Sequence, residues 1–147
     1  MDIERFENLV PLDHGLSVVV TRRADHSPHT SVVNAGVISH PSSGEPVVAF
    51  VAAGEARKLV NVRRDPVIAV VIRAGWQWAT VEGRAELIGP DDPHPHFDAE
   101  RIRLLLREIF TAAGGSHDNW DTYDRVMIEE RRTAVLVIPS RVYSNPT

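Results

Sequence analysis

The chain has 147 residues, of which 43% are hydrophobic, enough for one globular domain over residues 1–147 with a sizeable core. Its formal net charge of −4 argues against a general nucleic-acid binder, because affinity for a phosphate backbone needs a basic surface. The absence of cysteine excludes disulfides, thiolate metal sites and cysteine nucleophiles. No stretch approaches the roughly 20 apolar residues of a membrane span, and the acidic N-terminus lacks a signal-peptide pattern, so we expect a cytoplasmic protein.

Hydrophobic periodicity predicts a first helix and five strands between residues 2 and 88, in addition to the short helix of residues 55–65 described below. Ile3, Phe6 and Leu9 lie on one side of an amphipathic helix over residues 2–10. Apolar and β-branched runs separated by turn residues predict strands over residues 16–21, 29–39, 47–51, 67–73 and 76–88. Because most of these strands follow one another as local hairpins, the pattern indicates an antiparallel sheet that closes into a small barrel.

The rest of the chain predicts two helices and a last strand. Three prolines in residues 89–97 preclude a regular element there. Asp98 is the expected cap of a helix that ends near residue 113, and its apolar stripe comprises Ile102, Leu105, Leu106, Ile109 and Phe110. A second helix over residues 119–130 places Trp120, Tyr123 and Met127 on one face, and a strand over residues 133–138 follows.

Residues 47–66 carry the clearest functional signal. An apolar strand breaks at Gly54, and a short helix runs from Glu55 to a stop at Asp65. Arg57 and Lys58 fall in its first turn, where free N–H groups and the positive end of the helix dipole favour an anion. Lys58 is the only lysine beside fifteen arginines. The pattern fits a phosphate site, and the alternative is a pair of ordinary solvated helix residues.

The segment around Trp76 and Trp78 is a second candidate site. In a strand these two side chains share one face, which suits the core, a subunit interface or the wall of a pocket for a planar ring. Gly83, in the middle of the same strand, predicts a bulge or the close approach of another backbone or a ligand.

Other constellations favour no chemistry. The histidines and aspartates of residues 91–96 lack a third metal ligand at a defined spacing, so a solvated loop is the better interpretation. The Asp-His-Ser sequence at residues 25–27 is not read as a triad, because triad members meet through the fold. No glycine pattern of the Rossmann or Walker type occurs.

Three segments together resemble a known superfamily. They are Glu55-Ala-Arg-Lys58 followed by Asn61 and Asp65-Pro66, GWQWATVEGRAEL at residues 75–87, and residues 117–143. They are similar to the split-barrel flavin and deazaflavin oxidoreductases, which share the fold of pyridoxamine 5′-phosphate oxidase. The C-terminal segment resembles the class B branch that uses coenzyme F-420. The resemblance covers nearly the whole chain and implies a six-stranded antiparallel split β-barrel with flanking helices.

The chain departs from the oxidase in two ways. Ala52 and Ala56 stand where a threonine and a serine would be expected near the phosphate. The C-terminal Arg-Leu-His-Asp-Arg signature, which handles the pyridoxal substrate, is absent. Oxidation of pyridoxamine phosphate is therefore not expected.

The resemblance implies a homodimer with the cofactor in a groove between subunits. The implied cofactor-binding residues are Arg57, Lys58 and Asn61 near the phosphate, Ser31, Val32 and Val33 beside the ring, and Trp78 as an aromatic from the partner chain. The implied reaction is hydride transfer between F-420 and a small unsaturated substrate, which needs orientation and exclusion of water more than a protein nucleophile.

Three questions stay open from the sequence. Arg22, Arg23, Arg63 and Arg64 are either a basic rim for the acidic glutamyl tail of F-420 or ordinary surface residues. An FMN-dependent oxidase or reductase would share the fold and the phosphate site. A non-catalytic protein that binds F-420 or flavin is the third possibility.

Overall fold

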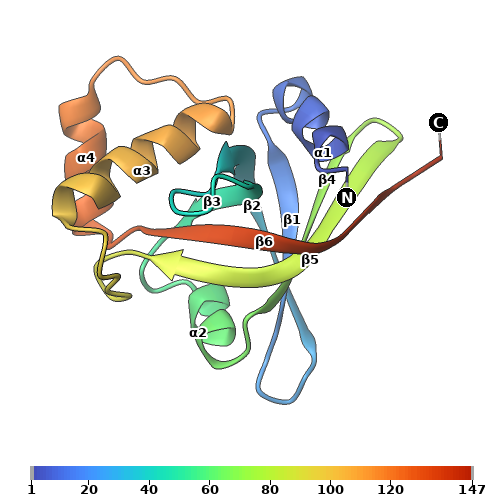
Figure 1. The fold of residues 1–147 in the computed structure, drawn as a ribbon, viewed down its shortest axis with the longest axis horizontal. Helices are drawn as coiled ribbons and strands as arrows, with labels where there is room; N and C mark the ends of the chain where they lie inside the picture. The colour runs from blue at the N-terminus through green and yellow to red at the C-terminus, as the bar shows by residue number, and fades with distance from the viewer. Residues whose placement is uncertain (1, 147) are drawn as a thin grey trace.

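The computed structural model describes residues 2–146 and contains a closed six-stranded barrel flanked by helices (Figure 1). The strands are β1 Leu16–Arg22, β2 Pro28–Ser39, β3 Pro46–Ala52, β4 Val67–Ala74, β5 Gln77–Ile88 and β6 Thr133–Ser144. The helices are α1 Glu4–Leu9, α2 Arg57–Arg64, α3 Ala99–Ala112 and α4 Trp120–Glu129, with a 3-10 turn at Val10–Leu12. The strand order is β1-β2-β3-β6-β5-β4 and all pairs are antiparallel, which confirms the predicted fold class.

The apolar core lies in two layers. Inward-facing residues such as Val19, Val70 and Val81 fill the barrel, and Phe6 of α1 and Leu59 of α2 join the same cluster. Figure 1 shows these two short helices on opposite sides of the strands, so each helps to close the barrel interior. Within residues 2–146, no helix is long and apolar enough to cross a membrane.

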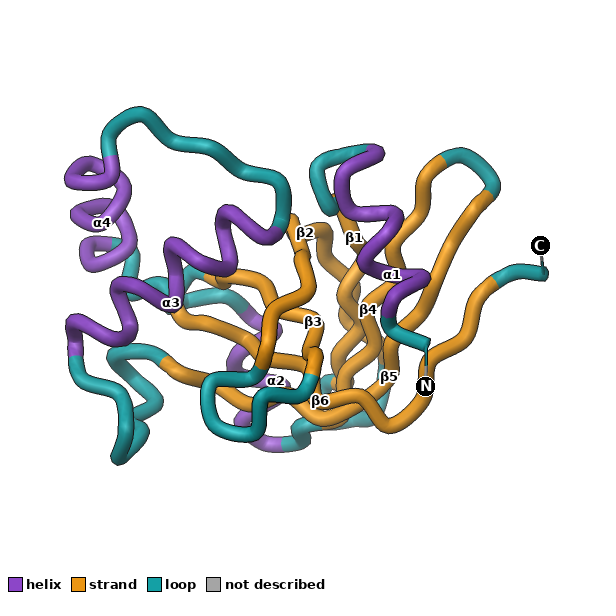
Figure 2. Tube along the Cα trace, turned by 45° about the horizontal axis from the view of Figure 1, so that its top comes forward, coloured by secondary structure: helices purple, strands orange, loops and turns teal. Residues whose placement is uncertain are grey.

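Helices α3 and α4 form a second layer outside the barrel (Figure 2). The predicted stripe on α3 is confirmed, since Leu105, Leu106 and Ile109 are buried against β2, β3 and β6. Asp98 caps α3 by accepting a hydrogen bond from the Arg101 N–H at 2.9 Å, as predicted. On α4, Tyr123 is buried in the same cluster.

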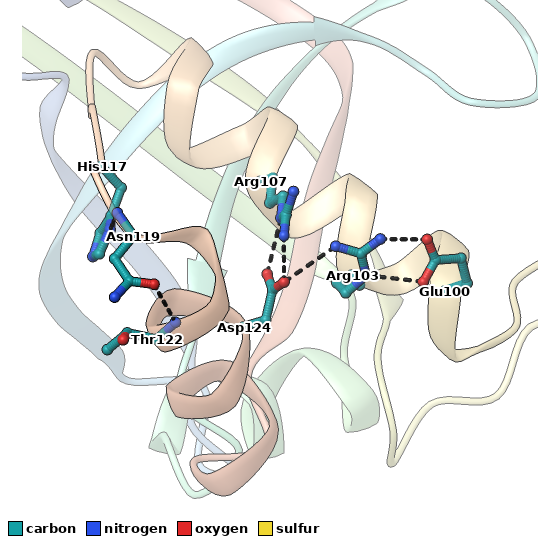
Figure 3. Close-up of polar contacts among 7 residues, drawn as sticks. All are labelled: Glu100, Arg103, Arg107, His117, Asn119, Thr122 and Asp124. Carbon is teal, nitrogen blue, oxygen red and sulfur yellow. Dashed lines mark hydrogen bonds and ion pairs between the residues drawn. The ribbon is translucent and has the colours of Figure 1, made fainter.

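An acidic side chain ties the two outer helices together. Asp124 of α4 accepts hydrogen bonds from Arg107 Nε at 3.0 Å and from Arg103 Nη1 at 3.1 Å, both on α3 (Figure 3). Arg103 also pairs with Glu100. The paired guanidinium groups lower the pKa of Asp124, chiefly through the hydrogen bond from Arg107.

Gly83 permits close contact between β5 and β6. The register shifts between Glu82 and Gly83, which confirms the predicted irregularity. A Cβ at Gly83 would lie 2.0 Å from the carbonyl oxygen of Ile138, so only glycine fits this approach.

Two boundaries differ from the sequence-based expectation. β6 continues to Ser144 instead of ending at residue 138, because Pro139 falls at the register shift opposite Gly83, where a missing N–H is tolerated. The predicted pairing of Trp76 with Trp78 on one strand face is wrong. Gly75 has a φ of +61° and takes the first place of a two-residue turn, so Trp76 occupies the second place and is 94% exposed.

Candidate cofactor site

A cavity of about 570 Å³ lies between the barrel and the helices α2, α3 and α4. Its floor comes from β2 and β3, with Val32, Val33, Val51 and Ala52. Its roof comes from the outer helices, with Ile109, Phe110, Tyr123 and Met127. Two cations, Lys58 and Arg132, also line it. The volume falls in the usual range for a small-molecule or cofactor site, so the cavity suits an apolar, planar molecule that carries an anionic group.

Lys58 is the central residue of the predicted phosphate site. Helix α2 begins after an extended Ala56 that provides no side-chain cap, so Arg57 and Lys58 occupy its first turn as predicted. Burial, and then the nearby charge of Arg132, lower the pKa of the Lys58 ammonium. No carboxylate within residues 2–146 forms an ion pair with Lys58. An anion bound here would relieve both unfavourable effects.

Arg132 is a cavity residue that the sequence reasoning missed. It precedes β6 and holds the Glu130 carboxylate with Nε at 2.8 Å and Nη2 at 2.7 Å. The adjacent Arg131 points to another partner and forms an ion pair with Asp91. The Arg-Arg pair before the last strand was the available signal, but the sequence does not show which arginine faces the cavity.

Two buried polar atoms on β2 lack partners within the described chain. They are Oγ of Ser31 and Nδ1 of His29. The pKa of His29 is lowered by burial first and then by the charges of Arg23, Lys58 and Arg57, which places this strand close to the start of α2. Buried polar groups are almost always hydrogen-bonded, but neither of these residues lines the cavity. The fit to a phosphate-bearing cofactor is carried instead by Lys58, a cation of the lining that has no carboxylate partner in the described chain.

The predicted site residues are only partly brought together. Lys58, Val32 and Val33 line the cavity, whereas Arg57 is exposed and Ser31 lies outside the lining. Asn61 is buried and donates to Thr21 Oγ1 at 3.0 Å.

Trp78 lies on the outer face of β5 and makes an edge-to-face contact with Tyr143, with ring centroids 6.1 Å apart. Trp78 does not line the cavity of its own chain. Its role toward a partner chain stays a prediction.

The four arginines of the expected rim divide into two pairs. Two have carboxylate partners: Arg22 binds Asp65 at 2.9 Å and Arg63 binds Asp92 at 2.7 Å. Arg23 donates to Ser27 and Pro28, and Arg64 donates to the Arg22 carbonyl at 2.7 Å. These acceptors are neutral, so Arg23 and Arg64 keep the charge that an acidic tail would need.

The loop of residues 91–96 presents no metal site in the part of the chain that the structure describes. Asp91 is engaged by Arg131 and Asp92 by Arg63. Both carboxylates therefore act as ion-pair partners that attach this loop to the α4–β6 turn and to α2.

No protein-family model matches the sequence. Among solved structures, the chain is similar to the conserved hypothetical protein Rv2991 from Mycobacterium tuberculosis, with a TM-score of 0.68 and 21% identity over 98% of this chain and 84% of that one. An F420 reductase aligns with a TM-score of 0.60 and 12% identity over 91% and 93% of the two chains. A pyridoxamine 5′-phosphate oxidase-related, FMN-binding protein from Nostoc punctiforme aligns with a TM-score of 0.57 and 15% identity, over 97% and 79%.

These likenesses establish the fold. The chain is a split β-barrel of the kind seen in pyridoxamine 5′-phosphate oxidase-like proteins, and the neighbours include both an F420 reductase and an FMN-binding protein.

Proposed function

We propose that the protein is an oxidoreductase of the class B type that binds coenzyme F-420 and transfers hydride between the deazaflavin and a small unsaturated substrate. The observation that carries the proposal is the half-buried Lys58, which has no carboxylate partner in the described chain and lines an apolar cavity at the start of α2. F-420 supplies or accepts the hydride when it is bound.

The residues of this chain would bind the cofactor and orient its ring. Lys58, Arg132 and the first N–H groups of α2 would hold the phosphate, because cations and a helix N-terminus attract the same anion. Val32 and Val33, which line the cavity, would lie along the ring. The apolar roof would exclude water from the reacting atoms.

FMN is the alternative cofactor, because the same cations would hold its phosphate. Ala52 and Ala56 line the cavity and offer methyl groups where the oxidase has hydroxyls, so this site depends on charge more than on hydroxyl donors. A non-catalytic F-420 or flavin carrier would show the same binding without turnover.

We also propose that two copies of the chain assemble through the outer face of the barrel. Val32, Val18 and Val71 lie directly opposite one another on β2, β1 and β4, and the row continues through Thr80 and Tyr143 on β5 and β6. Val32 is 66% exposed and Val18 is 41% exposed. A connected apolar row of this kind is typical of an interface.

The apolar row also reaches the cofactor cavity, because Val32 belongs to both. A second copy that covers the row would therefore cover this edge of the cavity too. Trp78 shares the outward face of β5 with Thr80 and packs against Tyr143, so it is placed to contact that second copy.

Replacement of the lysine tests the cofactor site. Lys58→Ala should weaken F-420 binding about 10- to 150-fold, which corresponds to the roughly 1.5–3 kcal/mol of a charge-assisted hydrogen bond. The measurement is an equilibrium titration of the protein with F-420, monitored through the intrinsic fluorescence of the protein. Arg125→Ala is the matched control, because Arg125 is an exposed cation on α4 whose nearest carboxylate, Glu129, is 3.9 Å away.

The stability of the empty protein separates binding from folding. Because the pKa of Lys58 is lowered in the folded state, its charge costs folding free energy, and its removal should leave the melting temperature unchanged or slightly higher. Unchanged F-420 affinity in Lys58→Ala would show that the phosphate lies elsewhere.

A further inference from the structure

His14 has an unusual backbone conformation at the entrance to β1. Its φ is +56° and that of the following Gly15 is +65°, so two successive residues adopt the left-handed region. Histidine is one of the few non-glycine residues enriched there, and such conformations persist only where the surroundings fix them.

Several contacts fix this turn. Asn34 of β2 donates its side-chain N–H to the His14 carbonyl at 2.8 Å, and the Gly15 N–H binds the Val10 carbonyl at 2.8 Å. A Cβ at Gly15 would lie 2.2 Å from the Ala35 carbonyl oxygen, so the chain passes as close to β2 as glycine allows. The turn therefore holds the His14 backbone in a defined place.

That place is the rim of the cofactor cavity. His14 lines the cavity together with Asn34 and the C-terminal end of α3. Figures 1 and 2 both show this end of α3 beside the connection from α1 to β1. His14 is also exposed, so this residue borders both the cavity and the solvent.

Four titratable side chains line the cavity, and three of them already have another role or a hydrogen-bond partner. Lys58 and Arg132 are the cations assigned to the phosphate, and a guanidinium does not give up its proton in proteins. Tyr123 is buried and donates its hydroxyl hydrogen to the Leu106 carbonyl at 3.0 Å. The imidazole of His14 makes no hydrogen bond within the described chain and is the lining group suited to proton transfer.

We propose that His14 is the proton donor for the substrate, an inference that rests on the proposed hydride transfer. Reduction of a carbon–carbon double bond needs one hydride and one proton. The reduced cofactor, when bound, would supply the hydride to one carbon, and the His14 imidazolium would supply the proton to the electron pair of the π bond at the other carbon. The electrons of the broken N–H bond stay on the ring, and the neutral imidazole regains a proton from water.

The test compares His14→Asn with His26→Asn. Asparagine tolerates the left-handed region, so the turn is retained. His26 is the matched control, because it also has a positive φ, of +71°, but lies in the exposed β1–β2 turn and does not line the cavity. Both variants should bind F-420 with the affinity of the unaltered protein.

The first readout is independent of turnover. The probe 2-cyclohexen-1-one is added to protein loaded with oxidised F-420, and the histidine ring signals are followed by NMR, with the His14 signal assigned by its loss in His14→Asn. The His14 signal should shift with probe concentration while the His26 signal does not. An unmoved His14 signal in a protein that binds the probe would overturn the inference.

The second readout is the reduction of the same probe by reduced F-420. His14→Asn should slow it by about 100-fold or more, the scale of general acid catalysis. His26→Asn should leave the rate unchanged. A rate equal to that of the unaltered protein would refute the role of His14 alone, whereas failure of the unaltered protein to bind F-420 would refute the proposed function itself.

Discussion

Tyr123 shows how a single residue of the cavity roof links ionisation to stability. Its ring is buried against α3, and burial raises the pKa of its phenol to about 12. The folded state therefore keeps the phenolic proton at a pH where the unfolded chain, with an ordinary value of 10.0, has lost it. The contribution of Tyr123 to the free energy of unfolding is fully present below pH 10 and is lost as the pH rises toward 12.

We predict that the free energy of unfolding falls by about 2–3 kcal/mol between pH 10 and pH 12, since each pKa unit is worth about 1.4 kcal/mol. Urea unfolding across this range is the measurement. Tyr123→Phe should remove most of the fall, at a cost near 1 kcal/mol at pH 8 for the hydrogen bond to Leu106.

Tyr143→Phe is the control, because Tyr143 is 41% exposed in the single chain and the pKa of its phenol is raised mainly by its hydrogen bond to Glu82. Solvent screens that contact, so this variant should keep the alkaline loss of stability. An equal effect of both substitutions would contradict the assignment to Tyr123.

Local sequence patterns could predict Lys58, but not the residues that complete its site. The position of Lys58 follows from the strand, the break at Gly54 and the start of a helix, all within a few residues. Arg132 and His14 reach the cavity from distant parts of the chain. Their placement depends on how β6 and the α1–β1 connection pack, which no local pattern contains.

At the scale of elements, helices α3 and α4 act as one roof because Asp124 joins them. The carboxylate lies between two guanidinium groups and is mostly shielded from water, with 13% of its side chain exposed (Figure 3). Its loss would leave Arg107 without a carboxylate partner in the described chain, whereas Arg103 would keep its ion pair with Glu100.

Asp124→Asn should lower the free energy of unfolding by roughly 1–3 kcal/mol at pH 7, the scale of hydrogen bonds to charged groups. Because the pKa of Asp124 is lowered from its ordinary value of 3.8, the difference should persist above that pH and disappear as the pH falls through the lowered value. Hydrogen exchange of the α4 amides and urea unfolding measure it. Glu129→Gln, in an exposed pair on the same helix, should have little effect, and an equal effect would contradict the account.

The helices and strands follow closely from the periodicity of the sequence. The two wrong predictions, the end of β6 and the place of Trp76, have structural causes. The strands alternate between barrel interior and solvent, so their pattern is strong. The sequence predicts that the last strand ends at residue 138, because Pro139 follows and a proline interrupts most strands. In the structure Pro139 lies at a register shift opposite Gly83 of β5, and the sequence around Pro139 does not show this pairing. Trp76 was assigned to a strand because the sequence leaves open which two residues form the turn at Gly75.

At the scale of the molecule, the barrel places its apolar outer face and its cavity side by side through Val32. The dimer proposal predicts that a charge in this face separates the subunits. Val18→Arg, which lies opposite both Val32 and Val71, should convert a dimer into a monomer in sedimentation experiments and weaken F-420 binding.

Ile128→Arg is the control for this experiment, because Ile128 is an exposed apolar residue on α4, away from the apolar row. It should leave both the assembly and F-420 binding unchanged. A Val18→Arg protein that remains dimeric would place the interface on another face of the barrel.

The central claim is that the cationic cavity is built for a deazaflavin. The most direct test is a side-by-side equilibrium titration of the purified, cofactor-free protein with F-420 and with FMN, followed by intrinsic fluorescence. The account predicts micromolar or tighter binding of F-420, about −8 kcal/mol or more, and much weaker binding of FMN. A clear preference for FMN would contradict the deazaflavin assignment, and binding of neither would contradict a cofactor role for the cavity.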